Sequence, residues 1–197
     1  MKSSEAQLPA AELSQGPMID SPETAYRPLL EAVAFAARAH HGQLRKDGRT
    51  PYASHVFRVC LIVRHVFGID DASALTAAVL HDTVEDTTTD FDDLKEKFDE
   101  RVAGWVADLS KDKRLPEAER EKEYEARLAK SPWQVKVCKL ADTFDNLMDS
   151  IHMPPEMQAR SLRNAHRYLA ALKSNLPEEA RRPWDIVLRL LAEIEAK

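Results

Sequence analysis

The chain has 197 residues, with 28 Lys and Arg against 33 Asp and Glu and a formal net charge of −5. That length suits one domain with a hydrophobic core of its own. The negative balance argues against broad electrostatic binding to nucleic acid or to an anionic membrane, so a phosphorylated ligand would need a local basic pocket. The N-terminal sequence lacks an apolar signal segment, and no run reaches the roughly 18 apolar residues that span a bilayer. We therefore expect a cytoplasmic protein without a membrane partner.

The composition predicts an all-α fold. Only five residues are glycine and 44% are hydrophobic, and the apolar runs are rich in Ala and Leu, which favour helices over strands. We expect a bundle of about eight to ten helices. Cys60 and Cys138 fall at apolar helix positions, which favours buried thiols over a disulfide or a metal site and fits a reducing cytoplasm.

Residues 1–20 are mostly small and polar with no sustained period, which is typical of a flexible tail. Residues 21–197 are then expected to form a single domain. Ser21 and Pro22 look like an N-cap and a first helical residue, so the first helix should run from about residue 24 to residue 41. Its apolar positions predict a buried face made of Leu30, Val33, Ala34 and Ala37.

A polar connector, residues 40–52, follows this helix and contains the basic residues Arg45, Lys46 and Arg49. Loops of this kind carry function more often than packing. The alternative is a solvated turn with routine positive charge, and these residues alone favour neither. In an anionic chain, a basic cluster beside a candidate metal site would be more telling.

The second helix should begin at Thr50-Pro51 and continue to Phe67, ending at Gly68. His55 shares a face with Val59, Ile62 and Val66, so it points inward from the first turn. A lone inward histidine is more often a hydrogen-bonded core residue than a ligand, unless the chain supplies partners. His65 is expected at the surface.

The partners come from the stretch between Leu75 and Thr87. Asp82 lies seven positions after Leu75 and so falls on the same apolar face. An unpaired buried carboxylate costs several kcal/mol, so a cation, a metal or a full set of hydrogen bonds must compensate it. The neighbouring His81 makes a metal the simplest compensator. The plain alternative is a helix end with acidic residues and an incidental histidine.

Glu85 and Asp86 lie at i+4 from this His-Asp doublet and add two carboxylates on the same rim. Asp70 should cap the helix, which is expected to fray at residues 87–89. Residues 90–110 predict a short acidic helix and a second helix with an apolar face. The charged segment 111–130 is expected to be a solvated, mobile helix at the edge of the molecule. Within residues 90–110, the apolar face of the later helix should consist of Val102, Trp105, Val106 and Leu109.

Ser131-Pro132 opens a long helix to about Ile151. Its expected apolar stripe consists of Val137, Cys138, Ala141, Phe144, Met148 and Ile151. The opposite stripe is polar and contains Asp142, Asp145, Asn146 and Asp149. A solvated acidic face is the alternative, but Asp142 follows a largely apolar run and should lie deep. Two more helices, at about residues 155–173 and 177–196, complete the bundle.

The inward candidates His55, His81, Asp82 and Asp142 come from three helices. A mixed set of imidazole nitrogens and carboxylate oxygens suits Mn²⁺, Fe²⁺ or Zn²⁺ and leaves coordination positions open for water and substrate. Such a site would be catalytic.

With these residues identified, the sequence resembles the HD-domain metal-dependent phosphohydrolases, which are named for a doublet like His81-Asp82. Three segments carry a narrower resemblance to the hydrolase domain of the RelA/SpoT group, best to the stand-alone small alarmone hydrolases. They are Arg-Lys-Asp-Gly with Thr-Pro-Tyr-Ala-Ser-His, Ala-Ala-Val-Leu-His-Asp-Thr-Val-Glu-Asp-Thr, and Lys-Leu-Ala-Asp with Asn146. The resemblance covers about residues 25 to 175.

This resemblance implies an HD-type helical fold, one Mn²⁺ or another divalent transition metal, and removal of the 3′-pyrophosphate of guanosine tetra- or pentaphosphate. It implies that Glu85 and Asp86 orient or activate the attacking water. The implied partner is a nucleotide, and a homo-oligomer is left open. The implied metal ligands are His55, His81, Asp82 and Asp142, and the expected substrate contacts are Arg45, Lys46, Asn146 and Asp149. We expect Arg45 to stack on the base and Lys46 to contact phosphate or ribose.

Two residues depart from the family pattern. Thr143 stands where a basic residue is usual, and Asp145 stands where His or Tyr is usual. An added carboxylate near the pocket would weaken affinity for a highly charged phosphate. Another nucleotide, such as an adenosine alarmone or a simple nucleotide, is therefore one alternative substrate. A non-enzymatic nucleotide-binding module is the other alternative, although the presence of Glu85 and Asp86 favours an enzyme.

Overall fold

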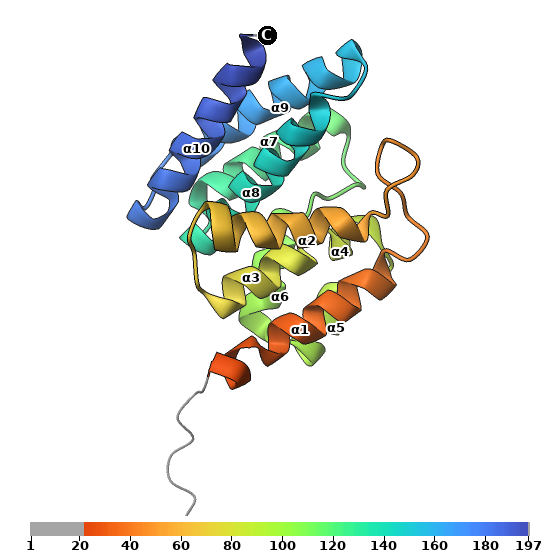
Figure 1. Ribbon diagram of the computed structural model, residues 1–197. Coiled ribbons are helices and arrows are strands. Elements are labelled where there is room, and N and C mark those ends of the chain that lie inside the picture. The colour runs from red at the N-terminus through yellow and green to blue at the C-terminus, as the bar shows by residue number, and fades with distance from the viewer. Residues whose placement is uncertain (1–21, 197) are drawn as a thin grey trace, which may run out of the picture.

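The computed structural model describes residues 22–196, which form ten α-helices and one π-helical segment (Figure 1). The predicted all-α fold is confirmed, and the helix count agrees with the expected eight to ten. Residues 1–20 and Ser21 lie outside the described residues. The helices are α1 (Pro22–Ala39), α2 (Ala53–Leu61), α3 (Ala72–Leu80), α4 (Thr83–Asp86), α5 (Phe91–Lys97), α6 (Glu100–Leu109), α7 (Glu117–Lys130), α8 (Trp133–Ser150), α9 (Pro155–Lys173) and α10 (Glu178–Glu195), with the π segment at Ile62–Val66.

Helix α8 lies at the centre of the fold, between α2 and α3 on one side and α9 and α10 on the other (Figure 1). It packs against all four of these helices and against α6. Every residue from 135 to 143 is buried. Because polar groups lose water when buried, the polar side chains in this segment must find partners inside the protein. Helix α8 therefore carries both the core and the deepest part of the candidate site.

The predicted buried face of α1 is wrong. Leu30 is 69% exposed, whereas Ala32 and Ala36 are fully buried and Val33 is half-buried. Helix α1 packs mainly against α3, whose facing residues are largely alanines, and small side chains on both helices allow their axes to approach closely. The apolar pattern of α1 allowed two overlapping faces one residue apart, and the face with Ala32 and Ala36 is the one that packs inward. Of the predicted face, Ala34 and Ala37 are also exposed.

The expected third helix is divided in two. Helix α3 ends at Leu80, and Asp82 has backbone angles of φ −98° and ψ −3° before α4 begins at Thr83. The expected cap is also displaced by one residue, because the Asp71 side chain, not that of Asp70, accepts the hydrogen bond from the Ala74 N–H. The break turns the chain at the His-Asp doublet.

Two further expectations are corrected by packing. The charged helix α7 is not purely solvated, since it buries Tyr124 and Leu128 and packs against α9. The end of the α8 apolar stripe is exposed at Met148 and Ile151. The expectation for α6 is confirmed, as Val102, Val106 and Leu109 are buried and Trp105 is half-buried.

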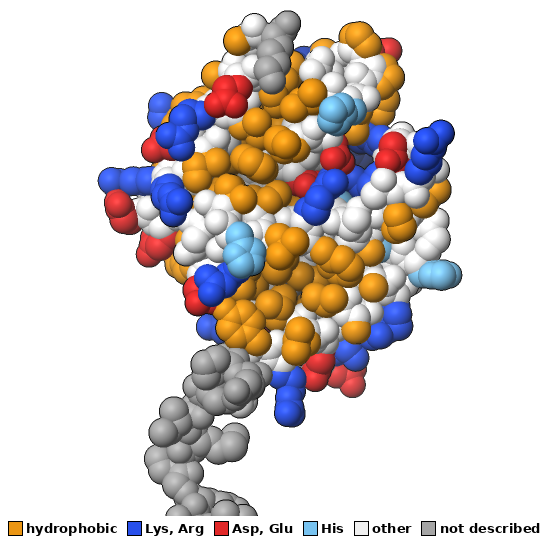
Figure 2. Space-filling model, in the orientation of Figure 1, with side chains coloured by type: hydrophobic (Ala, Val, Ile, Leu, Met, Phe, Trp, Pro, Cys, Tyr) orange, Lys and Arg blue, Asp and Glu red, His pale blue; other side chains and the backbone are white. Residues whose placement is uncertain are grey.

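Some apolar side chains also reach the surface (Figure 2), and Leu30, Leu61 and Leu188 are among the larger exposed ones. None of the described helices is both long and apolar enough to cross a membrane. Cys60 and Cys138 are free thiols, the first half-buried and the second buried, as expected.

The position of the α3 cap gives a first prediction. Asp71→Ala should lower the free energy of unfolding by about 1 kcal/mol, because it removes a side-chain acceptor from the first turn of α3. The matched control is Asp70→Ala, which removes only surface contacts with Arg64 and Tyr26 and should cost less. Urea unfolding of both variants measures the difference. A larger loss at Asp70 would assign the cap to that residue instead.

Candidate active site

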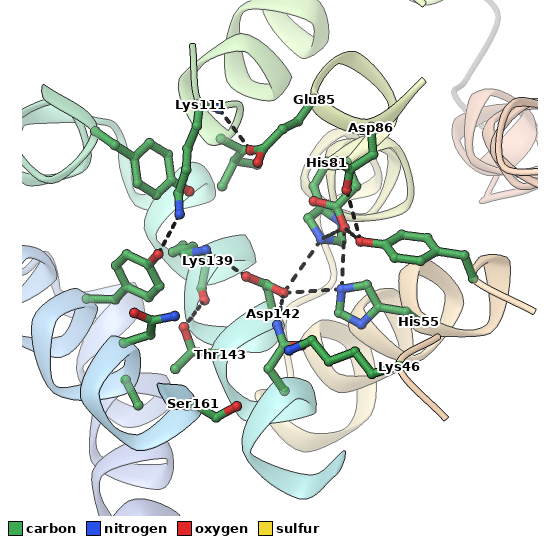
Figure 3. Close-up of a pocket in the computed structure, with 18 residues that line it drawn as sticks. Lys46, His55, His81, Glu85, Asp86, Lys111, Lys139, Asp142, Thr143 and Ser161 are labelled. Carbon is green, nitrogen blue, oxygen red and sulfur yellow. Dashed lines mark hydrogen bonds and ion pairs between the residues drawn. The ribbon is translucent and has the colours of Figure 1, made fainter. Parts of the chain in front are cut away.

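The candidate site is a pocket where α2, the junction of α3 and α4, α8 and α9 meet (Figure 3). The connector before α2 also contributes, as do the loop after α6 and one side chain of α7. The pocket brings together most of the residues expected from the sequence. Those that line it are Lys46, His55, His81, Asp82, Glu85, Asp86, Asp142 and Asn146, whereas Arg45 and Asp149 do not.

Two imidazoles and two carboxylates converge on one point of this pocket (Figure 3). His55 Nε2 lies 3.2 Å from Asp142 Oδ1 and 3.5 Å from Asp82 Oδ2. His81 Nε2 lies 3.1 Å from Asp82 Oδ2 and 3.8 Å from Asp142 Oδ1. One ligand atom from each of His55, His81 and Asp82 lies within 4.8 Å of the other two. The four side chains can therefore surround one small cation.

The orientation of both histidines favours a metal. His81 Nδ1 contacts the Ala78 carbonyl at 2.9 Å, and because a carbonyl only accepts, this nitrogen carries a proton. His55 Nδ1 contacts the Asp145 carboxylate at 2.6 Å. Both rings thus turn Nε2 toward Asp82 and Asp142. Among the described residues His81 Nε2 is buried without a hydrogen-bond partner, and a divalent metal would satisfy it together with the carboxylates.

The charges of the cluster are strongly coupled. Burial favours neutral His55, yet its hydrogen bonds to Asp142, Asp145 and Asp82 outweigh that effect and raise its pKa to about 9. Burial would likewise raise the pKa of the two carboxylates. Instead, His81 beside Asp82 and Lys139 beside Asp142 hold both carboxyl pKa values well below their usual range. The carboxylates therefore attract positive charge, whether protons or a metal ion.

Asp142 is fixed from both sides. Its Oδ2 accepts a hydrogen bond from Lys139 Nζ at 2.7 Å, and its Oδ1 accepts one from Asn146 Nδ2 at 2.6 Å. Lys139 Nζ also lies 4.2 Å from the ring centre of Tyr168, which is a cation–π distance. The deep carboxylate predicted from the apolar run is therefore present, and its charge is partly matched within α8.

Glu85 and Asp86 lie on the rim of the pocket, one turn after the doublet (Figure 3). Glu85 Oε2 accepts a hydrogen bond of 2.9 Å from the Lys111 backbone N–H, and burial raises the Glu85 pKa. Asp86 pairs with Lys113 and accepts a 3.2 Å hydrogen bond from the Tyr52 hydroxyl, which lies 2.6 Å from Asp82 Oδ2. Glu85 can therefore take a proton in a partly dry environment, whereas Asp86 is more constrained by its partners.

Comparisons with known proteins identify the family. A family model described as "HD domain" matches residues 32–172. The chain belongs to the HD-domain family. It is 43% identical over 129 residues to guanosine-3′,5′-bis(diphosphate) 3′-pyrophosphohydrolase MESH1 of Danio rerio, which is 65% of this chain and 72% of that protein. The identity and the coverage are the same for Homo sapiens MESH1.

This chain is also similar to a solved structure. It is that of a metazoan ortholog of SpoT that hydrolyses ppGpp, which superposes on this HD-domain chain with a TM-score of 0.72. The two share 30% sequence identity, and the match covers 93% of this chain and 97% of the other. The similarity thus extends through nearly the whole fold.

Arg45 and Asp149, two of the expected substrate contacts, lie beside the pocket and do not line it. The Arg45 guanidinium donates to Asp149 Oδ2 at 2.7 Å and to Asn146 Oδ1 at 3.1 Å, and it lies 5.5 Å from the ring centre of Tyr52. Only 8% of Arg45 is exposed, so little of its face is open to a nucleotide base. Lys46 is exposed and lines both this pocket and a neighbouring one that includes Arg45 and Asp149.

The expected position of Asp145 beside the pocket is wrong. Asp145 is 2% exposed and lies behind His55, where its carboxylate pairs with Arg58. Its charge is paired and it does not line the pocket, so the position from which it was expected to weaken phosphate binding is not the one it occupies. Thr143, the other departure, does line the pocket, and its hydroxyl donates to the Lys139 carbonyl.

The sequence reasoning missed several pocket residues. Lys111 comes from a segment expected to be solvated, and Tyr168 lies on a helix for which no site residue was expected. A signal existed for Lys139, since a lysine inside a buried run requires a partner. No helical period indicates that Lys111, in the loop after α6, would reach α9. The missed residues that line the pocket include Tyr52, Lys111, Tyr124, Lys139, Ser161, Asn164, Ala165 and Tyr168.

Proposed function

We propose that this protein is a metal-dependent hydrolase that removes the 3′-diphosphate of guanosine-3′,5′-bis(diphosphate). The activity of its relatives supports the reaction. The observation that carries the proposal is the convergence of the Nε2 atoms of His55 and His81 with the carboxylates of Asp82 and Asp142. The free thiols of Cys60 and Cys138 support the proposed cytoplasmic location.

In this proposal His55, His81, Asp82 and Asp142 hold one divalent cation, with Mn²⁺ our choice for the mixed nitrogen and oxygen donors. When bound, such a cation supplies a Lewis acid that acidifies water and neutralises phosphate charge. The protein's own contribution is to orient the donors, through the Nδ1 contacts of the histidines and the two hydrogen bonds to Asp142. These contacts fix the donor directions before a ligand arrives.

Lysines lie on both sides of the ligand cluster (Figure 3), and the exposed Lys46 would bind the phosphate groups, because Lys111 and Lys139 are paired with Glu121 and Asp142. Lys46 lies on one side of Asp142, and Lys111 and Lys139 lie on the other. This arrangement supplies the local positive charge that an anionic chain needs for a polyanionic substrate. It favours a diphosphate ester over a neutral ligand. Arg45, already bonded to Asp149 and Asn146, would support the wall next to Lys46.

The chemistry then requires a proton acceptor for the attacking water. Water attacks phosphorus, the bond between phosphorus and the ribose 3′-oxygen breaks, and that oxygen takes up a proton, so that guanosine 5′-diphosphate and diphosphate are released. Glu85 would accept the proton of the water, because its carboxylate is held by the Lys111 N–H and its pKa is raised by burial. Asp86, fixed by Tyr52 and Lys113, would orient the water.

Product analysis tests the reaction itself. The protein is incubated with guanosine tetraphosphate and Mn²⁺, and the nucleotides are separated by anion-exchange chromatography. Guanosine 5′-diphosphate and diphosphate in equal amounts are expected. Faster turnover of an adenosine analogue or of a simple nucleotide would favour the alternative substrates, and tight binding without turnover would favour a binding module.

Metal content provides a second prediction. Purified protein loaded with Mn²⁺ and desalted should retain one ion per chain, and the double variant His55→Ala/His81→Ala should retain none, because two of the four donors are lost. His65→Ala, an exposed histidine on the π segment, serves as the control and should retain the ion. Elemental analysis measures the content. Stoichiometric metal in the double variant would overturn the assignment.

Glu85→Gln separates binding from chemistry. The variant should keep its metal and lose about 10²- to 10⁴-fold in kcat, because it removes a proton acceptor with little change in volume. At saturating metal, the wild-type rate should fall as the pH drops through the Glu85 pKa, which lies above the usual value of 4.5, since the protonated carboxyl cannot accept. Glu117→Gln, exposed on α7, is the control. A near-normal rate for Glu85→Gln would transfer the role to Asp86.

The role of Lys46 is tested through ionic strength. Lys46→Ala should raise KM for guanosine tetraphosphate, and the increase should be larger at low salt than at high salt, because salt screens charge interactions. Arg49→Ala, an exposed basic residue three positions later that does not line the pocket, should have little effect. An equal increase in KM for the two variants would mean that Lys46 acts only through the general surface charge.

A further inference from the structure

We propose that Asp145 and Arg58 act together as positioning residues that present His55 Nε2 to the metal. The inference depends on the proposed metal site and adds two residues that contact no substrate. Helix α2 supplies the ligand His55 and, three residues later, Arg58. Helix α8 supplies the ligand Asp142 and, three residues later, Asp145. Each of these two helices therefore provides one ligand and one supporting residue at i+3 spacing.

Asp145 is in direct contact with the far nitrogen of the ligand. Its Oδ2 lies 2.6 Å from His55 Nδ1, while His55 Nε2 faces Asp82 and Asp142. Both residues are nearly inaccessible, at 2% and 1% exposure. A carboxylate on the second nitrogen fixes the ring orientation and increases the basicity of the first, which strengthens metal binding.

Arg58 fixes the carboxylate in turn. Its Nε donates to Asp145 Oδ1 at 2.7 Å and its Nη2 donates to Asp145 Oδ2 at 2.8 Å, which forms a two-point fork. The same Nη2 lies 2.7 Å from Asp149 Oδ1, one turn along α8. With both oxygens bound in this way, Asp145 cannot rotate away from His55. Arg58 therefore acts on the metal through Asp145.

The second histidine shows why this support is distinctive. His81 Nδ1 contacts the backbone carbonyl of Ala78, which belongs to α3 and cannot be altered by changing a side chain. Only the His55 orientation depends on side chains outside the ligand set. The affinity for Mn²⁺ should therefore respond to substitutions at Asp145 and Arg58, although these leave every metal donor in place.

Chelator competition for Mn²⁺ measures the effect without any assay of turnover. Asp145→Asn keeps the shape but removes the charge, and it should weaken Mn²⁺ affinity by about 10- to 100-fold. Arg58→Met should weaken affinity in the same direction but less. The double variant should bind about as weakly as Asp145→Asn alone, since residues acting through one another are not additive. Arg64→Met, which removes a surface ion pair with Asp70, is the matched control and should bind normally.

The outcomes separate the inference from the proposal on which it depends. If the wild-type protein binds no Mn²⁺, the metal site itself fails. If the wild type binds Mn²⁺ and both Asp145→Asn and Arg58→Met bind it equally tightly, the positioning role is overturned. Thermal unfolding of the metal-free proteins provides the second readout, because a purely structural role would lower the melting temperature and leave affinity unchanged. If Asp145→Asn does not fold, Arg58→Met decides, since it retains Asp145.

Discussion

The structure depends on two carboxylates, Asp82 and Asp142, that are kept close together in a largely desolvated position. Such a pair repels itself and loses hydration, so it persists only where positive charge and hydrogen-bond donors surround it. The fold supplies these groups from several directions. Two imidazoles approach from α2 and the α3–α4 junction, and Lys139 approaches from α8 itself. The two carboxylates together with the two imidazoles make the cluster a candidate metal site.

The packing of the helices brings the required donors to Asp82 and Asp142. The donors must come from separate helices, and α8 contacts both the helix that carries His55 and the helix that leads to His81. The break after Leu80 matters here, because it lets Asp82 turn toward α8 while α3 stays buried against α1. The charges extend outward in layers, from Asp142 to His55, then to Asp145 and to Arg58 at the surface. Each group along this path therefore contacts a hydrogen-bonding or oppositely charged neighbour.

Periodicity within a helix predicted much of the ligand set. His55 was identified because Val59, Ile62 and Val66 define its face, and Asp142 because an apolar run precedes it. The same reasoning failed for α1, where two apolar faces were equally regular and the one that packs inward was not the one predicted. It also failed for Lys111 and Tyr124, since a local pattern does not reveal which distant segment will cover a pocket. Asp145 was misplaced for a related reason: its position on α8 was correct, but its partner Arg58 lies on another helix.

The location of Asp145 bears on how much negative charge a substrate of this pocket can carry. A carboxylate facing the ligand would oppose a molecule with several phosphate charges, whereas a carboxylate bound by Arg58 and His55 behind the metal does not. What a ligand meets in the pocket is Lys46 on one side and Lys111 and Lys139 on the other, with the carboxylate cluster between them. A divalent cation in that cluster would offset the charge of Asp82 and Asp142 and leave Lys46 as a basic group at the pocket, despite the −5 charge of the chain. The departure from the family pattern at Asp145 is thus compatible with a polyanionic substrate, because its carboxylate contacts His55 and Arg58 and does not line the pocket.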